Sequence, residues 1–117
     1  MKFLSIDIEE ETRANTDYRR VIFTSQHSQV VLMNLIPGEE IGLEIHPDND
    51  QFLRFESGEG TAIINGRKYP VYPGVAFSIP AGTEHNFIND GFEELKLYTI
   101  YSPPHHPIGL IQHEKSD

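Results

Sequence analysis

The chain contains no cysteine, which excludes a disulfide scaffold and any metal site built on thiolates. No apolar run approaches the ~20 residues of a membrane-spanning helix, and the first residues do not have the profile of a secretory signal peptide. Basic residues are few: nine lysines and arginines stand against eighteen acidic residues, for a net charge of −9. Such a surface repels phosphate backbones and anionic lipid. We therefore expect a cytoplasmic protein without nucleic-acid or membrane partners.

Several catalytic signatures are also missing. The sequence has no nucleophile elbow, no phosphate-binding glycine loop and no paired-carboxylate motif. The glycine-rich stretch at 57–60 has the composition of a turn and does not indicate a phosphate site. Any chemistry must therefore come from side chains that the fold brings together.

The residues that are present predict a β protein. Turn signals recur every eight to twelve residues, which is typical of an all-β sandwich or barrel. Asn65-Gly66, between two β-rich runs, is the strongest hairpin signal. The polar segment Ile8–Arg20 predicts at most one short helical turn. The predicted strands are Gln29–Ile36, Ile41–His46, Gln51–Glu56, Gly60–Asn65, Lys68–Val71, Val75–Ile79, Glu84–Ile88 and Leu95–Tyr101.

The length of 117 residues suits one domain with one core. We expect residues 1–117 to form a single domain with its barrel at about 29–101, between a polar N-terminal segment and a C-terminal tail. Aromatic side chains are expected mainly in the core or at a subunit interface. The predicted lining of the interior pocket comprises Met33, Leu53, Phe55, Phe77, Phe87 and Tyr98.

Alternation along the strands predicts which polar side chains point inward. Glu44 and His46 are two residues apart and share a face. Gln51 shares a face with the apolar Leu53, so it should point inward too, as should His85 on a later strand. A buried carboxylate is costly unless it is paired or binds a cation. Two imidazoles, a carboxylate and an amide oxygen suit a divalent metal. The alternative is a metal-free network in which Glu44 pairs with a protonated histidine.

Two motifs carry a resemblance to the cupin superfamily. The later one resembles the second cupin signature, G-x5-P-x-G-x2-H-x3-N, at all its fixed positions: Gly74, Pro80, Gly82, His85 and Asn89. The earlier one resembles the first signature, G-x5-H-x-H-x(3–4)-E-x6-G. Gly38, His46 and Gly58 fit it, Glu44 stands in place of a histidine, and Gln51 stands in place of the glutamate. The chain looks most like small single-domain cupins labelled as relatives of mannose-6-phosphate isomerase.

The resemblance implies a double-stranded β-helix, a jelly-roll-like barrel, with a metal held by Glu44, His46, Gln51 and His85. The substitutions leave the charge of the ligand set unchanged, because one carboxylate is gained and one is lost. They give two nitrogen and two oxygen ligands in place of three nitrogens and one oxygen. This set has a harder ligand character, which favours Mn, Fe(II), Ni or Zn over copper.

This site predicts a metal-dependent enzyme acting on a small organic molecule, of the oxygenase or isomerase type. Glu44 is the candidate general base if it lies slightly outside the ligand set. The alternative is a non-catalytic module that binds a carbohydrate or carboxylate.

Cupins usually pair, so we expect a homodimer in which an N-terminal strand covers a sheet edge of the neighbour. The run Val21-Ile22-Phe23 is the candidate strand. His105 and His106 follow two prolines and are expected in a solvated loop, with a lid or a dimer contact as the alternatives.

Overall fold

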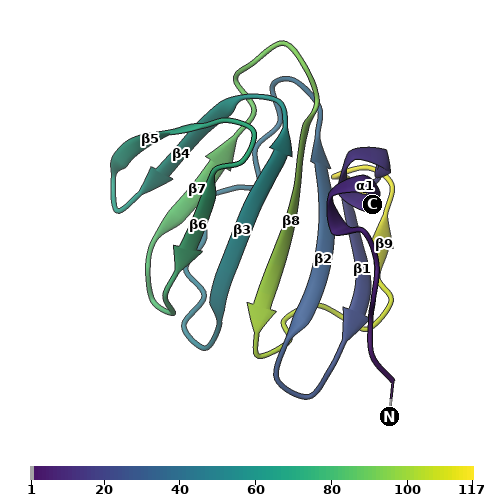
Figure 1. Cartoon of the computed structure of the whole chain (residues 1–117). Helices are drawn as coiled ribbons and strands as arrows, with labels where there is room; N and C mark the ends of the chain where they lie inside the picture. The colour runs from purple at the N-terminus through teal and green to yellow at the C-terminus, as the bar shows by residue number, and fades with distance from the viewer. Residues whose placement is uncertain (1) are drawn as a thin grey trace.

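The computed structural model describes residues 2–117 and consists mainly of antiparallel β-strands (Figure 1). One sheet has six strands in the order β6-β3-β8-β2-β1-β9, and the other has three in the order β5-β4-β7. The all-β prediction is confirmed. The elements are α1 (Ile8–Ala14), β1 (Arg19–Thr24), β2 (Gln29–Leu35), β3 (Asp50–Ser57), β4 (Gly60–Ile64), β5 (Arg67–Val71), β6 (Ala76–Ile79), β7 (His85–Ile88), β8 (Leu95–Ser102) and β9 (Ile111–Gln112).

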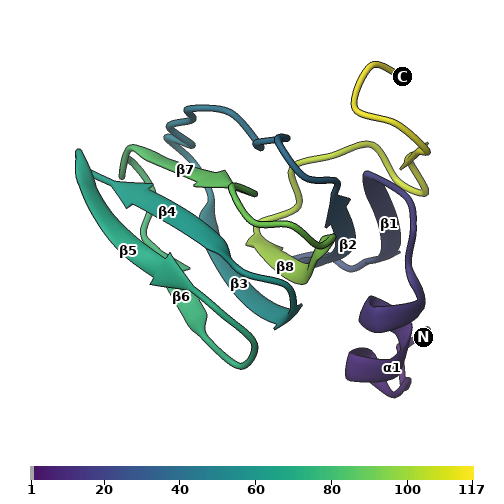
Figure 2. The same cartoon turned by 90° about the horizontal axis from the view of Figure 1, so that it is seen from above.

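The core lies between the two sheets, which face each other across it (Figure 2). Buried and part-exposed residues alternate along β8, as expected for a strand with one face on the core. Phe55 of β3, Leu97 of β8 and Phe87 of β7 are fully buried and bring both sheets into one cluster. The opposite face of the large sheet is contacted by α1, beside which the Lys96 ammonium donates to the Asn15 carbonyl oxygen at 2.6 Å. A site inside the barrel must therefore lie against the inner face of the large sheet.

The predicted strand Ile41–His46 is the one among the eight that does not form. It meets β7 at two isolated bridges, one from Glu40, just before the segment, to Ile88 and one from Glu44 to His85. The reason is Gly42, whose φ of +112° lies outside the strand region. Its amide donates to the Asn86 side-chain oxygen at 2.9 Å instead of to a neighbouring strand. The segment is extended but irregular, and it still carries Glu44 and His46 inward.

The N-terminal part is more ordered than predicted. Residues 8–14 form a seven-residue helix, about two turns, where one turn at most was expected. Asp7 caps it by accepting from the Glu10 amide at 3.0 Å, and three acidic residues in its first turn complement the helix dipole. The run Val21–Phe23 is a strand, but β1 pairs with β2 of its own chain. Within the chain both edges of β1 are paired, with β2 and with β9, and the pairing of this run with a neighbouring chain stays a prediction.

Asn89 ties the end of β7 to the rest of the barrel. Its fully buried Nδ2 donates to the carbonyl oxygens of Leu35 and Glu93, both at 2.8 Å. We expect Asn89→Ala to lower the free energy of unfolding by about 3 kcal/mol, because it leaves two carbonyls without their donor. Urea denaturation measures the change. Asp90→Ala removes only an exposed bond to Thr61 and should cost less than about 1 kcal/mol. Equal losses in the two variants would contradict the assigned role of Asn89.

Across residues 2–117, the structure contains no helix with the length and apolar character needed to cross a membrane.

Candidate metal centre

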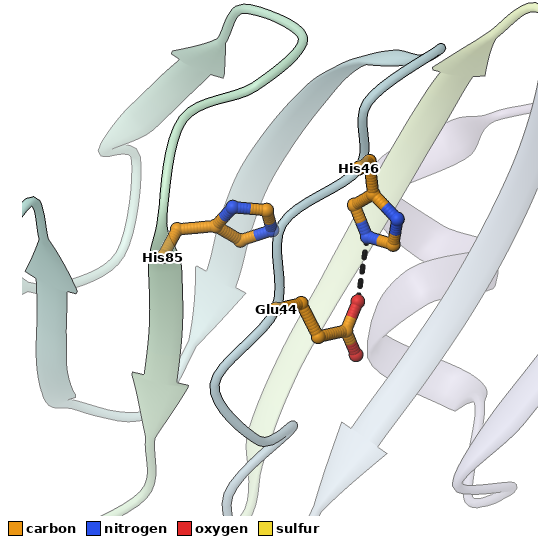
Figure 3. A group of neighbouring side chains, drawn as sticks. All are labelled: Glu44, His46 and His85. Carbon is orange, nitrogen blue, oxygen red and sulfur yellow. Dashed lines mark ion pairs between the residues drawn. The ribbon is translucent and has the colours of Figure 1, made fainter.

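Three of the four predicted polar residues form one compact group, shown in Figure 3. Ligand atoms of Glu44, His46 and His85 all lie within 4.8 Å of one another. Two backbone hydrogen bonds bring them together: the Glu44 amide donates to the His85 carbonyl at 2.9 Å, and the His85 amide donates back at 3.0 Å. A third, from the Gly82 amide to the His46 carbonyl at 2.8 Å, holds the following turn. The group is therefore set by backbone pairing between the segment at 41–47 and β7.

Glu44 and His46 are in direct contact. The carboxylate Oε2 lies 2.5 Å from Nε2 of His46 (Figure 3), whose residue is only 7% exposed. Burial lowers the pKa of His46 and outweighs the opposing effect of Glu44, while His105 and His85 lower it further. A low pKa favours the neutral imidazole, which is the form that binds metal. The buried Nε2 forms no hydrogen bond with any other described group.

Gln51 joins the group through its amide oxygen. Its buried Nε2 lies 3.0 Å from Thr99 Oγ1 and 3.2 Å from the Tyr101 hydroxyl, to both of which it donates. This orients Oε1 toward Nε2 of His85, at 3.1 Å. The other ring nitrogen of His85, Nδ1, lies 2.8 Å from the Thr83 carbonyl oxygen. All four residues predicted from the sequence therefore lie together.

The arrangement fits a bound cation. Both nitrogens of His85 face an oxygen atom, but a neutral imidazole carries only one N–H. When Nδ1 donates to the Thr83 carbonyl, a lone pair on Nε2 faces a lone pair on the Gln51 oxygen. A cation between these atoms removes that conflict, and a donated Nδ1–H is the usual orientation of a metal-binding histidine. Two imidazole nitrogens, one carboxylate and one amide oxygen suit a first-row divalent ion.

Gln51 offers a sharp test of this fit. We expect Gln51→Glu to bind Zn²⁺ or Mn²⁺ at least about tenfold more tightly than wild type, because a carboxylate is a better ligand than a neutral amide. The same variant should be less stable without metal, since it buries a second carboxylate beside Glu44. Gln51→Leu should weaken binding. Calorimetric metal titration and thermal unfolding measure the two effects, and metal affinity unchanged in both variants would contradict this placement of Gln51.

The predicted apolar lining lies on the inner face of the barrel, with one exception. Tyr98 pairs with Leu32 and Arg54 on the outer face of the large sheet, and its ring lies 6.4 Å from that of Phe52. Its place near the site is taken by Tyr101, which is three residues on and therefore on the opposite face. Burial raises the pKa of Tyr101 well above its usual range, so the phenol stays protonated. Of the remaining predicted residues, Phe77 is partly buried, and Met33, Leu53, Phe55 and Phe87 are fully buried.

Two histidines of the loop after β8 also approach the site. The ring of His105 lies 4.5 Å from that of His46 and stacks on Tyr101 at 5.2 Å. The ring of His106 lies 5.1 Å from Tyr101. Buried Gln29 holds the loop, because its Oε1 accepts from both histidine amides, at 3.1 and 2.9 Å. His105 is exposed, as predicted for a loop histidine, whereas His106 is only partly exposed and its Nε2 is buried. The alternatives of a lid and a dimer contact stay predictions. No local sequence signal indicates these contacts.

A surface cavity of about 750 Å³ lies elsewhere, against residues 58–60, 70–73 and 90–93. Its lining contains acidic, glycine and proline residues but none of the four polar groups described above. We assign no chemistry to it.

Comparison with known proteins gives concordant results. Residues 31–101 match the family described as Cupin domain. The uncharacterized protein YrkC of Bacillus subtilis (strain 168) is 46% identical over 118 residues, which cover 96% of this chain. This chain spans only 63% of the length of that relative. An uncharacterized protein of Acanthamoeba polyphaga mimivirus is 50% identical over 110 residues, which cover 91% of this chain and 69% of the relative.

Among solved structures, a Bacillus halodurans protein superimposes with a TM-score of 0.95 at 45% identity. The alignment covers 98% of this chain and 92% of that one. The likeness therefore includes the N-terminal helix and the C-terminal strand as well as the matched central region.

Proposed function

The chain belongs to the cupin family, and from that premise we propose that it is a divalent-metal protein with a double-stranded β-helix fold that acts on a small organic substrate. The observation that carries the proposal is the convergence of Glu44, His46 and His85 inside the barrel, with the Gln51 amide oxygen aimed at the same point. The narrower kinship with mannose-6-phosphate isomerase relatives, predicted from the sequence, stays a prediction.

The chain's own groups have complementary roles in this proposal. His46 and His85 would hold Mn, Fe, Ni or Zn through their Nε2 atoms, with Glu44 and the Gln51 oxygen completing the set. The hydrogen bond between Nδ1 of His85 and the Thr83 carbonyl fixes the orientation of that ring. The metal, when bound, supplies Lewis acidity toward substrate oxygen atoms.

When Glu44 lies just outside the ligand set instead of completing it, proton transfer falls to Glu44 and Tyr101. The side chain of Glu44 is 29% exposed, so it is the member of the group most accessible to a substrate. Its carboxylate can accept a proton from a carbon next to a carbonyl group, the first step of enolisation and isomerisation. The protonated phenol of Tyr101 accepts a hydrogen bond from Gln51 and keeps its own hydrogen for a substrate oxygen. An oxygenase would use the same positions to orient its substrate.

A second candidate is a binding module without turnover. The observation that favours it is Gln51 itself, because a neutral amide is a weaker ligand than the glutamate of the family signature. A weakly held metal suits reversible capture of a carbohydrate or carboxylate. Such a module would be stabilised by its ligand through mass action and would release no product.

The first experiment is elemental analysis of untagged protein, followed by titration with Mn²⁺, Fe²⁺, Ni²⁺ and Zn²⁺. We expect about one metal ion per chain, and an increase of about 2.7 kcal/mol in unfolding free energy at a metal concentration 100 times Kd. Oxygen uptake and product analysis with candidate substrates then separate an oxygenase, an isomerase and a binder. Protein that binds none of the four ions would contradict the metal proposal.

The homodimer is part of the same proposal, as is the cytoplasmic location. Within the chain β1 is paired with β2 and β9, so a dimer without strand exchange would use another surface. Sedimentation equilibrium should give twice the monomer mass of 13.3 kDa. A single species at 13.3 kDa would contradict the dimer.

A further inference from the structure

Arg19 is a cation on the inner face of the barrel without an acidic partner. In the β1–β2 register it lies opposite Met33, which is fully buried in the core. Met33 lies opposite Leu97 of β8, another core residue. Within residues 2–117, the ion pairs made by arginine involve Arg13, Arg20 and Arg54, and none involves Arg19. Arg19 lies on the inner face of the sheet, whereas Arg20, the next residue, lies on the outer face.

The contacts of the Arg19 guanidinium are all with neutral groups. Nη1 donates to the side-chain oxygen of Gln112 at 2.6 Å, and the guanidinium carbon lies 5.2 Å from the centre of the Tyr18 ring. Nε is buried and has no acceptor among the described residues. Burying a charged group without a counter-charge is unfavourable. Arg19 as a whole is only partly buried, and a partly buried guanidinium without a counter-charge favours an anionic ligand.

His106 supplies a second unpartnered polar atom on the same side of the site. Its Nε2 is buried and forms no hydrogen bond with a described group. Burial, assisted by the charge of Arg19, lowers the pKa of His106 to about 3, so the ring is neutral. The charge of Arg19 also acts on the pKa of Tyr101, against the larger effect of burial. The geometry agrees: the rings of His106 and Tyr101 lie 5.1 Å apart, and the segment that follows His106 runs along β1, where the Val21 amide donates to the Leu110 carbonyl at 2.9 Å.

Tyr101 connects this region to the candidate metal centre. Its hydroxyl accepts from Gln51, and its ring lies 5.8 Å from that of His46. Leu97, in the same row as Arg19, precedes Tyr101 by four residues on β8, which is about 13 Å along a strand. A long arginine side chain and a short ligand can span that distance together.

We propose that Arg19 and His106 bind the carboxylate group of a small carboxylic acid whose other end reaches Glu44, His46 and His85. The second half of this statement rests on the proposed function; the binding of a carboxylate by Arg19 does not. One guanidinium with one neutral imidazole matches a singly charged carboxylate, which arginine can bind through two parallel hydrogen bonds. A phosphate dianion would need more positive charge than this region offers beside Glu44. The substrate class is therefore a short carboxylic acid rather than a sugar phosphate.

The test uses the full chain, with and without Zn²⁺. The probes are sodium glycolate, pyruvate and gluconate, their neutral amides, and inorganic phosphate. Their binding is measured by thermal unfolding and calorimetry at pH 7. We expect at least one carboxylate to stabilise the wild type while its amide does not. Arg19→Met should weaken the binding of that carboxylate by about 10- to 100-fold and leave the metal content unchanged. Arg19→Lys should bind the carboxylate with intermediate affinity, because lysine keeps the positive charge but cannot donate two parallel hydrogen bonds as the planar guanidinium does.

Arg20→Met is the matched control, since Arg20 is adjacent, exposed and paired with Asp17 on the outer face. It should bind the carboxylate as wild type does. The proposal is overturned if no carboxylate binds, if Arg19→Met binds it equally well, or if phosphate binds more tightly. Loss of metal binding with carboxylate binding intact would instead contradict the proposed function and leave the Arg19 site standing.

Stability without ligand provides an independent readout. An arginine kept for ligand binding is an uncompensated cation in the free protein, so Arg19→Met should keep or raise Tm. An arginine whose role is structural, through Gln112 and Tyr18, would give a lower Tm when replaced. A lower Tm in ligand-free Arg19→Met would thus overturn the proposal even where carboxylate binding also falls.

Discussion

The double variant His46→Ala/His85→Ala is expected to lose bound metal while it retains the β fold. Both imidazoles belong to the group whose ligand atoms lie within 4.8 Å of one another, and the remaining oxygens of Glu44 and Gln51 form a poor set by themselves. Since removal of an outer hydrogen-bond partner alone typically weakens metal binding 10- to 100-fold, loss of two ligands should exceed about 100-fold. Elemental analysis and calorimetric titration measure the loss.

A control must separate this effect from a general loss of histidine. His27→Ala/His113→Ala removes two exposed histidines that lie outside the group, and it should bind metal as wild type does. Far-ultraviolet circular dichroism verifies that each double variant is folded. Stoichiometric metal in the His46/His85 variant would show that the ion binds elsewhere, and the buried polar residues would then form a metal-free network.

Phe55→Ala should be the most destabilising single replacement in the core. Phe55 is fully buried, and its ring lies 5.5 Å from Phe87 on the facing sheet and 6.1 Å from Phe77 on the neighbouring strand. Truncation leaves a cavity between the two sheets and should lower the free energy of unfolding by about 3–5 kcal/mol. Natural domains have total stabilities of about 5–15 kcal/mol, so this variant should be close to unfolding. Urea denaturation measures the change.

Phe92→Ala is the matched control, because Phe92 is fully exposed at 101%. It should change stability by less than about 0.5 kcal/mol. A similar loss in both variants would mean that Phe55 does not join the sheets as described. A small loss at Phe55 alone would mean that the core relaxes to fill the cavity.

Much of the candidate site could be predicted from the sequence because its determinants are local. Turn residues placed the strands, and alternation then assigned Glu44, His46, Gln51 and His85 to one interior. Alternation also places Glu44 and His46 correctly, although their segment is not a regular strand. The reason is that the extended backbone on either side of Gly42 still alternates its side chains. The assignment failed at Tyr98, because Tyr98 and Tyr101 are three residues apart and cannot share a face.

The rest depends on contacts between residues far apart in the sequence. Helix α1 is an exception, because the Asp7 side chain that caps it is adjacent in the sequence. The pairing of β1 with β2 is also local, because only residues 25–28 join the two strands. The register of that pairing, with its irregularity between Val21 and Phe23, is what places Arg19 opposite Met33. By contrast, the position of His105 against His46 depends on Gln29, 76 residues away.

The sequence by itself therefore determined the all-β class and the identity of the four polar groups that meet in the barrel, because strand alternation and turn chemistry act over a few residues. Only the tertiary structure decided what surrounds them. The register of β1 against β2 turned Arg19 inward, and a buried glutamine drew the rings of His105 and His106 to the site. Those contacts depend on register and loop path, which local preferences do not specify.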